Sequence, residues 1–274
     1  MDISGFRVVT GKEAVDVLLD RAKRLADHGV PPGKSVRTGL PKVDEGIRSW
    51  WGCVTLTGEP GIGKTALALR FASETAAAAA RVLWLCMGGH SELAVLRLIT
   101  SRARVRLRKV MVERSLTPQD WWALRRAGAE VSRWPIEFGD AHGATLDELR
   151  TLCSTVAVCP ACGRTPLELI VLDHFPAPDR PTLRTLQRVA DELNTPILTV
   201  FSPVADGGEA DDKGASQVRP GTLELSLQRA EDVPGSAPGR RLVLAVGRAG
   251  GTVEHRVPLE LVPEYRSVDA APSA

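Results

Sequence analysis

Short apolar runs alternate with amphipathic stretches along most of this chain. Continuous apolar runs predict buried strands, and apolar residues at helical spacing predict helices that lie against a sheet. The strands are predicted at 54–57, 82–85, 136–138, 167–173 and 196–201. The helices are predicted at 66–72, 91–99, 117–124, 145–156 and 183–193. This alternation is typical of an α/β fold with a mostly parallel central sheet flanked by helices.

The pattern changes after residue 222. Residues 223–227 alternate between apolar and polar, as a half-buried strand should. Two further runs, 241–246 and 253–257, are joined by a segment that contains Gly250 and Gly251. Because glycine pairs favour tight turns, these runs predict an antiparallel pair of strands at the C-terminal end of the sheet.

We divide the chain into residues 1–35, 36–266 and 267–274. The first part has a possible capping box at Thr10 and Glu13, followed by an apolar stripe. This predicts an amphipathic helix and a linker ahead of the main domain, with the stripe packed either on its own domain or on a neighbouring subunit. The main domain follows, and the last part is expected to be a disordered tail.

Composition sets only broad limits. The chain has 274 residues, 43% of them hydrophobic, so it can bury a large core. Its net charge of +2 argues neither for nor against a nucleic-acid partner. No apolar run is long enough to cross a membrane, so no membrane partner is expected and the protein is predicted to be cytoplasmic.

Eight consecutive residues carry the clearest chemical signal. They fit the pattern G-x-x-x-x-G-K-[ST] of a phosphate-binding loop, and they lie between a predicted strand and a predicted helix. They are Gly58, Glu59, Pro60, Gly61, Ile62, Gly63, Lys64 and Thr65. The glycines let the backbone approach a triphosphate, and N–H groups at the helix N-terminus bind its oxygens. The pattern predicts that Lys64 contacts the β- and γ-phosphates of ATP and that Thr65 binds Mg²⁺.

A second chemical signal is the apolar run 167–173, which ends in Asp173. Such a run suits a central parallel strand that delivers a carboxylate to the C-terminal edge of the sheet. In an enzyme with a phosphate-binding loop, this aspartate belongs to the Mg²⁺ site. Lys64 and Asp173 are therefore the predicted catalytic residues, and Thr65 and Asp173 the predicted magnesium site.

Several further segments resemble the C-terminal ATPase domain of DnaB-type replicative DNA helicases, which has a RecA-like fold. The matching segments are 38–44 (T-G-L-P-K-V-D), 92–99, 116–121 (L-T-P-Q-D-W), 145–150, 191–196 and 246–250 (V-G-R-A-G). The resemblance covers roughly residues 36–266, the size of one such domain. The loop at 58–64 is also similar to that of RadA-type recombination ATPases.

The resemblance implies an assembly as well as a fold. It implies a homo-oligomeric ring, such as a hexamer, with ATP between subunits, and a single-stranded DNA or replication-protein partner. Arg248 occupies the position of the family's arginine finger, which acts on the nucleotide of the neighbouring subunit. The alternative for Arg248 is a surface arginine in a hairpin, and the sequence does not choose between the two.

The departures from the family pattern concern hydrolysis. The family has S-L-E-M after its second strand, and the glutamate polarises the attacking water. Here the aligned residues are Cys86, Met87, Gly88 and Gly89, so Gly88 stands where that base should be. Loss of a general base commonly costs about 10²–10⁴ in rate. Glu59 or Glu92 could substitute, but neither is expected to point toward the site.

Three other departures point the same way. Ser202 replaces a glutamine that senses the γ-phosphate, Val246 replaces a lysine, and an acidic segment at 206–212 replaces a loop that faces DNA. The hypothesis is an ATP-binding protein with weakened hydrolysis, which acts in DNA replication or recombination or as a nucleotide-dependent regulatory or assembly factor. The alternative is an active DNA helicase, and a small-molecule kinase is a third, less well matched class.

The cysteines suggest a further possibility. Cys159 and Cys162 form a C-x-x-C pair that could hold Zn²⁺, with Cys153 as a third ligand. A structural zinc site needs four ligands, so two free cysteines in a loop is the favoured interpretation. Cys53 and Cys86 are expected to pack as small apolar residues.

Overall fold

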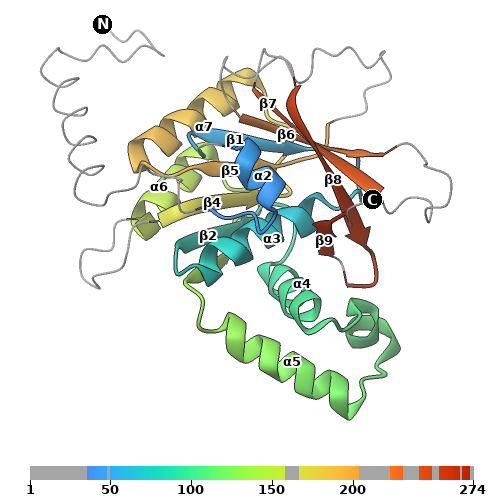
Figure 1. Cartoon of the computed structure of the whole chain (residues 1–274). Coiled ribbons are helices and arrows are strands. Elements are labelled where there is room, and N and C mark those ends of the chain that lie inside the picture. Colours follow the sequence, from blue (N-terminus) through green and yellow to red (C-terminus); the bar gives the residue numbers. More distant parts are fainter. Residues whose placement is uncertain are drawn as a thin grey trace, which may run out of the picture.

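A nine-stranded sheet organises the described part of the domain (Figure 1). The fold is given by a computed structural model, and the description covers residues 36–47, 50–157, 167–203, 223–230, 241–248, 253–265 and 267–271. The strands are β1 (Cys53–Thr57), β2 (Arg81–Cys86), β3 (Ile136–Asp140), β4 (Leu167–Asp173), β5 (Ile197–Val200), β6 (Leu223–Arg229), β7 (Arg241–Arg248), β8 (Val253–Val262) and β9 (Ser267–Ala270). Their order in the sheet is β3-β2-β4-β5-β1-β6-β7-β8-β9.

The sheet has a parallel half and an antiparallel half. All pairings from β3 to β6 are parallel, whereas β6, β7, β8 and β9 pair with one another antiparallel. The parallel strands β2 and β4 are buried almost throughout, as their continuous apolar sequence requires. In contrast, β6 alternates between buried and half-buried positions along most of its length.

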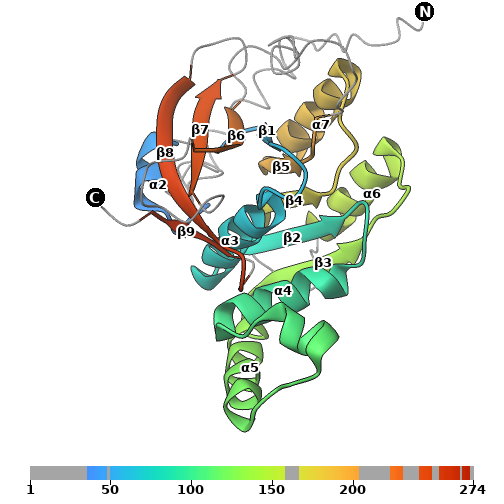
Figure 2. The same ribbon diagram turned by 90° about the vertical axis from the view of Figure 1, so that its right-hand side faces the viewer.

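The described helices are α2 (Pro41–Gly46), α3 (Lys64–Ala77), α4 (Ser91–Ala103), α5 (Pro118–Val131), α6 (Leu146–Ala157) and α7 (Arg180–Leu193), with a short π-helix at Lys109–Glu113. Helices α3, α4, α6 and α7 cover both faces of the parallel half, whereas α2 contacts β8 and α5 packs on α4. Helices α3 and α4 pack on one face through a core that includes Leu67, Phe71 and Leu98. Helices α6 and α7 pack on the other face, through a separate core around Leu149 and Leu186. Both layers are visible in Figure 2.

Local sequence explains where these helices start. Thr117 and Asp120 form the reciprocal capping box at the start of α5, because each side chain accepts a hydrogen bond from the backbone N–H of the other. Thr145 and Glu148 make the same arrangement before α6. Helix α5 packs mainly on α4 and projects from the body of the domain (Figures 1 and 2). Both Trp121 and Trp122 are exposed on it.

The predicted α/β fold is confirmed, including the mostly parallel sheet and the antiparallel C-terminal strands. One expectation was wrong in part, because residues 267–270 of the expected disordered tail form β9, which pairs with β8. Val268 is fully buried and Asp269 forms ion pairs with Arg70 and Arg104. These partners are distant in the sequence, so the local pattern of the tail does not predict them. The expected helix within 1–35 lies outside the described residues.

Candidate functional site

The phosphate-binding loop connects β1 to α3, and three of its residues are glycines with positive φ angles. Gly58 and Gly63 both have positive φ angles, +150° and +114°, which side chains rarely tolerate. A Cβ on Gly58 would lie only 2.5 Å from the backbone oxygen of Leu227 in β6, so the loop is also closely packed against the sheet. Gly63 is the residue immediately before α3, so the first N–H groups of that helix lie at the end of the loop.

Lys64 is held inside the loop. Its side chain folds back so that Nζ donates hydrogen bonds to the backbone oxygens of Gly58, at 2.8 Å, and of Glu59, at 2.7 Å. The residue is largely buried. Burial lowers the pKa of its ammonium group, and the charges of Asp173 and Glu59 act in the opposite direction. The geometry therefore fixes a positive charge beside the N-terminus of α3.

Asp173 ends β4 and meets the first turn of α3. The Thr65 hydroxyl donates a hydrogen bond to Asp173 Oδ1 at 3.0 Å, across 108 residues of sequence. Asp173 is only 2% exposed, and burial raises the pKa of its carboxyl, whereas the neighbouring His174 and the Thr65 hydroxyl lower it. Mg²⁺ prefers hard oxygen ligands, and a carboxylate beside a threonine hydroxyl fits that preference. The residues present therefore fit the predicted magnesium site.

These groups open onto a cavity of about 470 Å³. This volume lies within the range of small-molecule sites. Lys64, Thr65 and Asp173 contribute the polar wall. Apolar lining comes from Leu261 at the end of β8 and from Pro263 just after it. The structure thus brings the predicted loop and the predicted aspartate together at one pocket.

Gly88 lies at the edge of the same region. Strands β2 and β4 are neighbours, with Cys86 opposite Asp173, and the N–H of Met87 donates to the Asp173 carbonyl at 2.9 Å. A Cβ on Gly88 would lie 3.2 Å from the Cβ of His174, which itself lines the cavity. A glutamate at position 88, as in the family pattern, would therefore begin next to His174.

The two suggested substitutes for a base do not enter the cavity. Glu59 has a side chain that is 72% exposed and lies 3.6 Å from Arg229 Nε. Glu92 is exposed in the first turn of α4. Among the described residues that line the cavity, neither glutamate is present, whereas Ser202, after β5, is.

Arg248 does not belong to the described lining of this pocket. It is the last residue of β7, its side chain is 47% exposed, and its Nε lies 3.7 Å from Glu254 on the paired strand. A role on the nucleotide of another subunit and a role as a hairpin surface arginine are both compatible with this position, so the arginine-finger assignment stays a prediction.

The zinc hypothesis concerns residues that the description does not cover. Cys159 and Cys162 lie outside the described residues. Cys153 is buried in α6, and burial raises the pKa of its thiol to about 11, which disfavours the thiolate that zinc requires. Within the described part of the chain, no group of three or more metal-binding side chains is placed to hold a metal ion. Cys53 and Cys86 are buried, as expected for small apolar residues.

Sequence reasoning missed several residues of the pocket. His174, Leu261 and Pro263 line it, and Arg97 of α4 does too. The sequence marks Arg97 only as part of a family-like helix, and His174 only as a neighbour of Asp173. The β8 residues carry no local signal for nucleotide binding, because the fold alone brings them to the loop.

A glycine-rich loop between a parallel strand and a helix, with an aspartate at the end of a nearby strand, defines a phosphate-loop domain of the RecA-like class. The chain belongs to the family of the DnaB-like helicase C-terminal domain, whose model matches residues 35–202. None of the helices in the described residues is long and apolar enough to span a membrane.

Solved structures agree with this assignment. One that is described as an ATPase domain matches with a TM-score of 0.71 at 16% identity, covering 97% of this chain and 100% of that one. A DnaB-like replicative helicase, described with its interactions with primase, matches with a TM-score of 0.70 at 17% identity, covering 97% of this chain and 68% of the other. At these identities the likeness shows the shared fold. A comparison with curated proteins gave no match.

Proposed function

We propose that this protein binds ATP with Mg²⁺ at the phosphate-binding loop and hydrolyses it slowly. The observation that carries the proposal is the placement of Lys64, Thr65 and Asp173 around one cavity. In this assignment the loop N–H groups and Lys64 hold the phosphates, and Thr65 and Asp173 hold Mg²⁺. The ion would supply positive charge to the phosphate oxygens.

We infer slow hydrolysis from the lack of a side chain at Gly88, just after β2. Gly88 offers no side chain to orient or deprotonate a water, and neither Glu59 nor Glu92 belongs to the described lining of the cavity. General bases typically contribute about 10²–10⁴ to a rate, so binding can persist where turnover is weak. The protein then acts in DNA replication or recombination as a nucleotide-dependent regulatory or assembly factor, or with a weak motor activity of its own.

The proposal extends to assembly. Membership of the DnaB-like family supports a homo-oligomer, such as a hexameric ring, in the cytoplasm, with single-stranded DNA or a replication protein as partner. One matching structure is described with its interactions with primase, which supports a replication partner of that kind. In such a ring Arg248 reaches the nucleotide of the adjacent subunit. Light scattering with and without ATP tests this, and a monomer under both conditions removes that role for Arg248.

Steady-state ATPase measurements test the central claim. We expect measurable ATP binding in calorimetry, with slow turnover that single-stranded DNA does not increase strongly. The second candidate is an active DNA helicase, which the family match favours. Strong DNA-stimulated turnover by the unmodified protein would establish that alternative in place of ours.

A further inference from the structure

The C-terminal hairpin formed by β8 and β9 lies directly against the phosphate-binding loop. A Cβ on Gly63 would lie 3.1 Å from Leu261 Cδ1 of β8 and 3.4 Å from Val268 Cγ2 of β9. Val268 is fully buried, and it pairs with Leu261 across the two strands. The hairpin therefore covers the turn that precedes Lys64.

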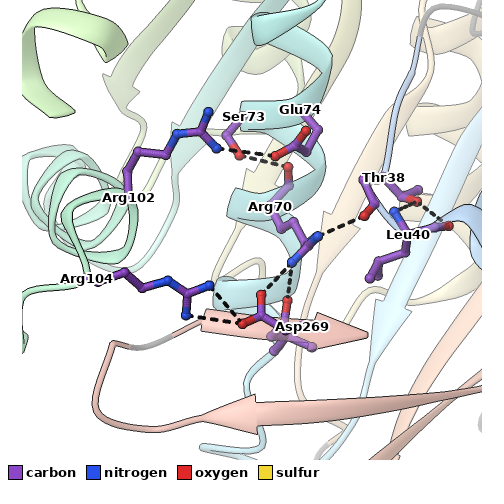
Figure 3. A network of polar contacts seen from close by, with 10 residues as sticks. Thr38, Leu40, Arg70, Ser73, Glu74, Arg102, Arg104 and Asp269 are labelled. Atoms are coloured by element: carbon purple, nitrogen blue, oxygen red, sulfur yellow. Dashed lines mark hydrogen bonds and ion pairs between the residues drawn. The ribbon is translucent and has the colours of Figure 1, made fainter. Parts of the chain in front are cut away.

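An ion pair fastens this hairpin to α3 (Figure 3). Arg70 Nη1 donates to Asp269 Oδ1 at 2.6 Å and to the Val268 carbonyl at 3.0 Å, and Nη2 donates to the Gly39 carbonyl at 2.8 Å. The side chains of Arg70 and Asp269 are only 25% and 28% exposed. Partial burial and multiple hydrogen bonds make such a pair stronger than a typical surface pair.

A second arginine binds the same carboxylate. Both terminal nitrogens of Arg104 lie 3.3 Å from Asp269 Oδ2. Arg104 follows the end of α4 in a left-handed conformation, with φ of +53°, and its side chain is 56% exposed. Asp269 thus joins β9 to α3 through a partly buried contact and to the end of α4 through an exposed one.

The position of Arg70 on α3 links this contact to the loop. Arg70 lies six residues after Lys64 on one continuous helix, which corresponds to about 9 Å of helix rise. The hairpin that Arg70 holds supplies Leu261 to the cavity that Lys64 and Thr65 line. A loop that is already held in its binding geometry loses less entropy when a ligand binds.

We propose that Asp269 is a positioning residue for nucleotide binding. Through Arg70 it holds β9 on Gly63, and the hairpin in turn keeps the phosphate-binding loop in its binding geometry. This inference rests on the proposed binding of ATP at that loop. It assigns a functional role to a strand whose own residues are not part of the described lining of the cavity.

The test compares full-length Asp269→Ala and Asp269→Asn with the unmodified protein. We expect Asp269→Ala to weaken ATP affinity about ten-fold in calorimetry with Mg²⁺, a size usual for coupling between two sites, and Asp269→Asn to weaken it less. Backbone hydrogen exchange should become faster both in 267–271 and in the loop at 58–65. The milder Asp269→Asn variant keeps the test valid if the alanine variant fails to fold.

Two controls separate positioning from general stability. Arg104→Ala removes the exposed contact to the same carboxylate and a cation–π contact with Tyr265, but it keeps the Arg70 ion pair, so its effect on affinity should be smaller than that of Asp269→Ala. Val189→Ala, in α7 on the opposite face, removes buried apolar contact without touching β9. It should lower thermal stability and leave ATP affinity unchanged.

The outcomes distinguish the two proposals. Faster exchange in β9 with unchanged exchange in the loop and unchanged ATP affinity would overturn the positioning role and leave ATP binding intact. An equal loss of affinity in Val189→Ala would overturn it too. If the unmodified protein does not bind ATP, the proposed function fails, and exchange in the loop of the Asp269 variants still decides whether Asp269 positions it.

Discussion

The ends of two neighbouring strands, β4 and β2, offer very different groups to a nucleotide. Strand β4 ends in Asp173, a buried carboxylate bonded to Thr65. Strand β2 leads to Gly88, which has no side chain and lies beside His174. The two ends are adjacent in the sheet, so the difference is local. In the function that we propose, binding and turnover depend on different strand ends, so one can be lost while the other is kept.

The largest expected effect comes from restoring a carboxylate at the end of β2. We expect Gly88→Glu to raise steady-state ATP turnover by about 10²-fold or more, because a general base contributes roughly 10²–10⁴. The new Cβ would lie 3.2 Å from the Cβ of His174, so the backbone must move by a few tenths of an ångström to accept the glutamate.

Gly88→Gln is the matched control for this change. It adds a side chain of nearly the same shape without a base, so turnover should stay at the level of the unmodified protein. Equal rates in the glutamate and glutamine variants would show that Gly88 does not occupy the position of the missing base.

Removal of the loop lysine tests nucleotide binding rather than turnover. We expect Lys64→Ala to weaken ATP affinity roughly 100-fold, because hydrogen bonds to charged groups are each worth about 1.5–3 kcal/mol. Calorimetry measures this, with Lys42→Ala, an exposed lysine of α2, as a control that keeps normal affinity. ATP affinity that survives Lys64→Ala would remove the basis of the proposed function.

Lys64, Asp173 and Gly88 differ in how well the sequence predicts them. Lys64 belongs to eight consecutive residues whose spacing is itself the site, so a local pattern is sufficient. Asp173 follows from an apolar run and the rule that parallel strands end at one edge. Gly88 could be placed only by resemblance to a family, and the structure then located it beside His174.

The C-terminal edge shows where sequence reasoning stops. The alternation in 223–227 and the paired runs that follow predict β6, β7 and β8, because their pattern is local. Strand β9 was missed, since it is four residues long and its ion-pair partner Arg70 lies 199 residues away. The apolar wall of the cavity was missed for the same reason, because only tertiary packing brings Leu261 to the loop.

Asp173→Asn should separate function from stability. Burial raises the pKa of Asp173 above its ordinary value of 3.8, so the folded state favours the neutral acid. The stability that the neutral acid provides is present at low pH and is lost as the pH rises through the raised pKa. At neutral pH we therefore expect the asparagine variant to be more stable by about 1 kcal/mol in chemical denaturation, as is common when a functional charge is removed.

The same variant should lose the Mg²⁺ dependence of ATP binding, which calorimetry with and without the metal measures. Asp140→Asn is the control. Asp140 of β3 pairs with Cys86 of β2, as Asp173 of β4 does from the other side, and it accepts a hydrogen bond from the Ser91 N–H. It should lower stability and keep the Mg²⁺ dependence. Unchanged Mg²⁺ dependence in Asp173→Asn would exclude this aspartate from the metal site.

The smallest expected effect concerns Glu224, a half-buried carboxylate of β6 that has no assigned role. Burial raises its pKa from 4.5 to about 7. Its contribution to stability is therefore fully present below pH 4.5 and is lost as the pH rises to about 7. Glu224→Gln should flatten this part of the pH profile and stabilise the protein on the order of 1 kcal/mol at neutral pH.

Unlike Asp173→Asn, this change should leave ATP affinity and its Mg²⁺ dependence intact, because Glu224 does not line the cavity among the described residues. Urea denaturation across pH 4–8 measures the profile, and calorimetry measures the affinity. Weaker ATP binding in Glu224→Gln would mean that a buried carboxylate outside the cavity also affects the site. The binding role would then not be specific to Asp173 at the end of β4. Stabilisation without a binding defect would show that carboxylate burial costs stability at both positions, whereas the role in Mg²⁺ binding is specific to Asp173 beside Thr65.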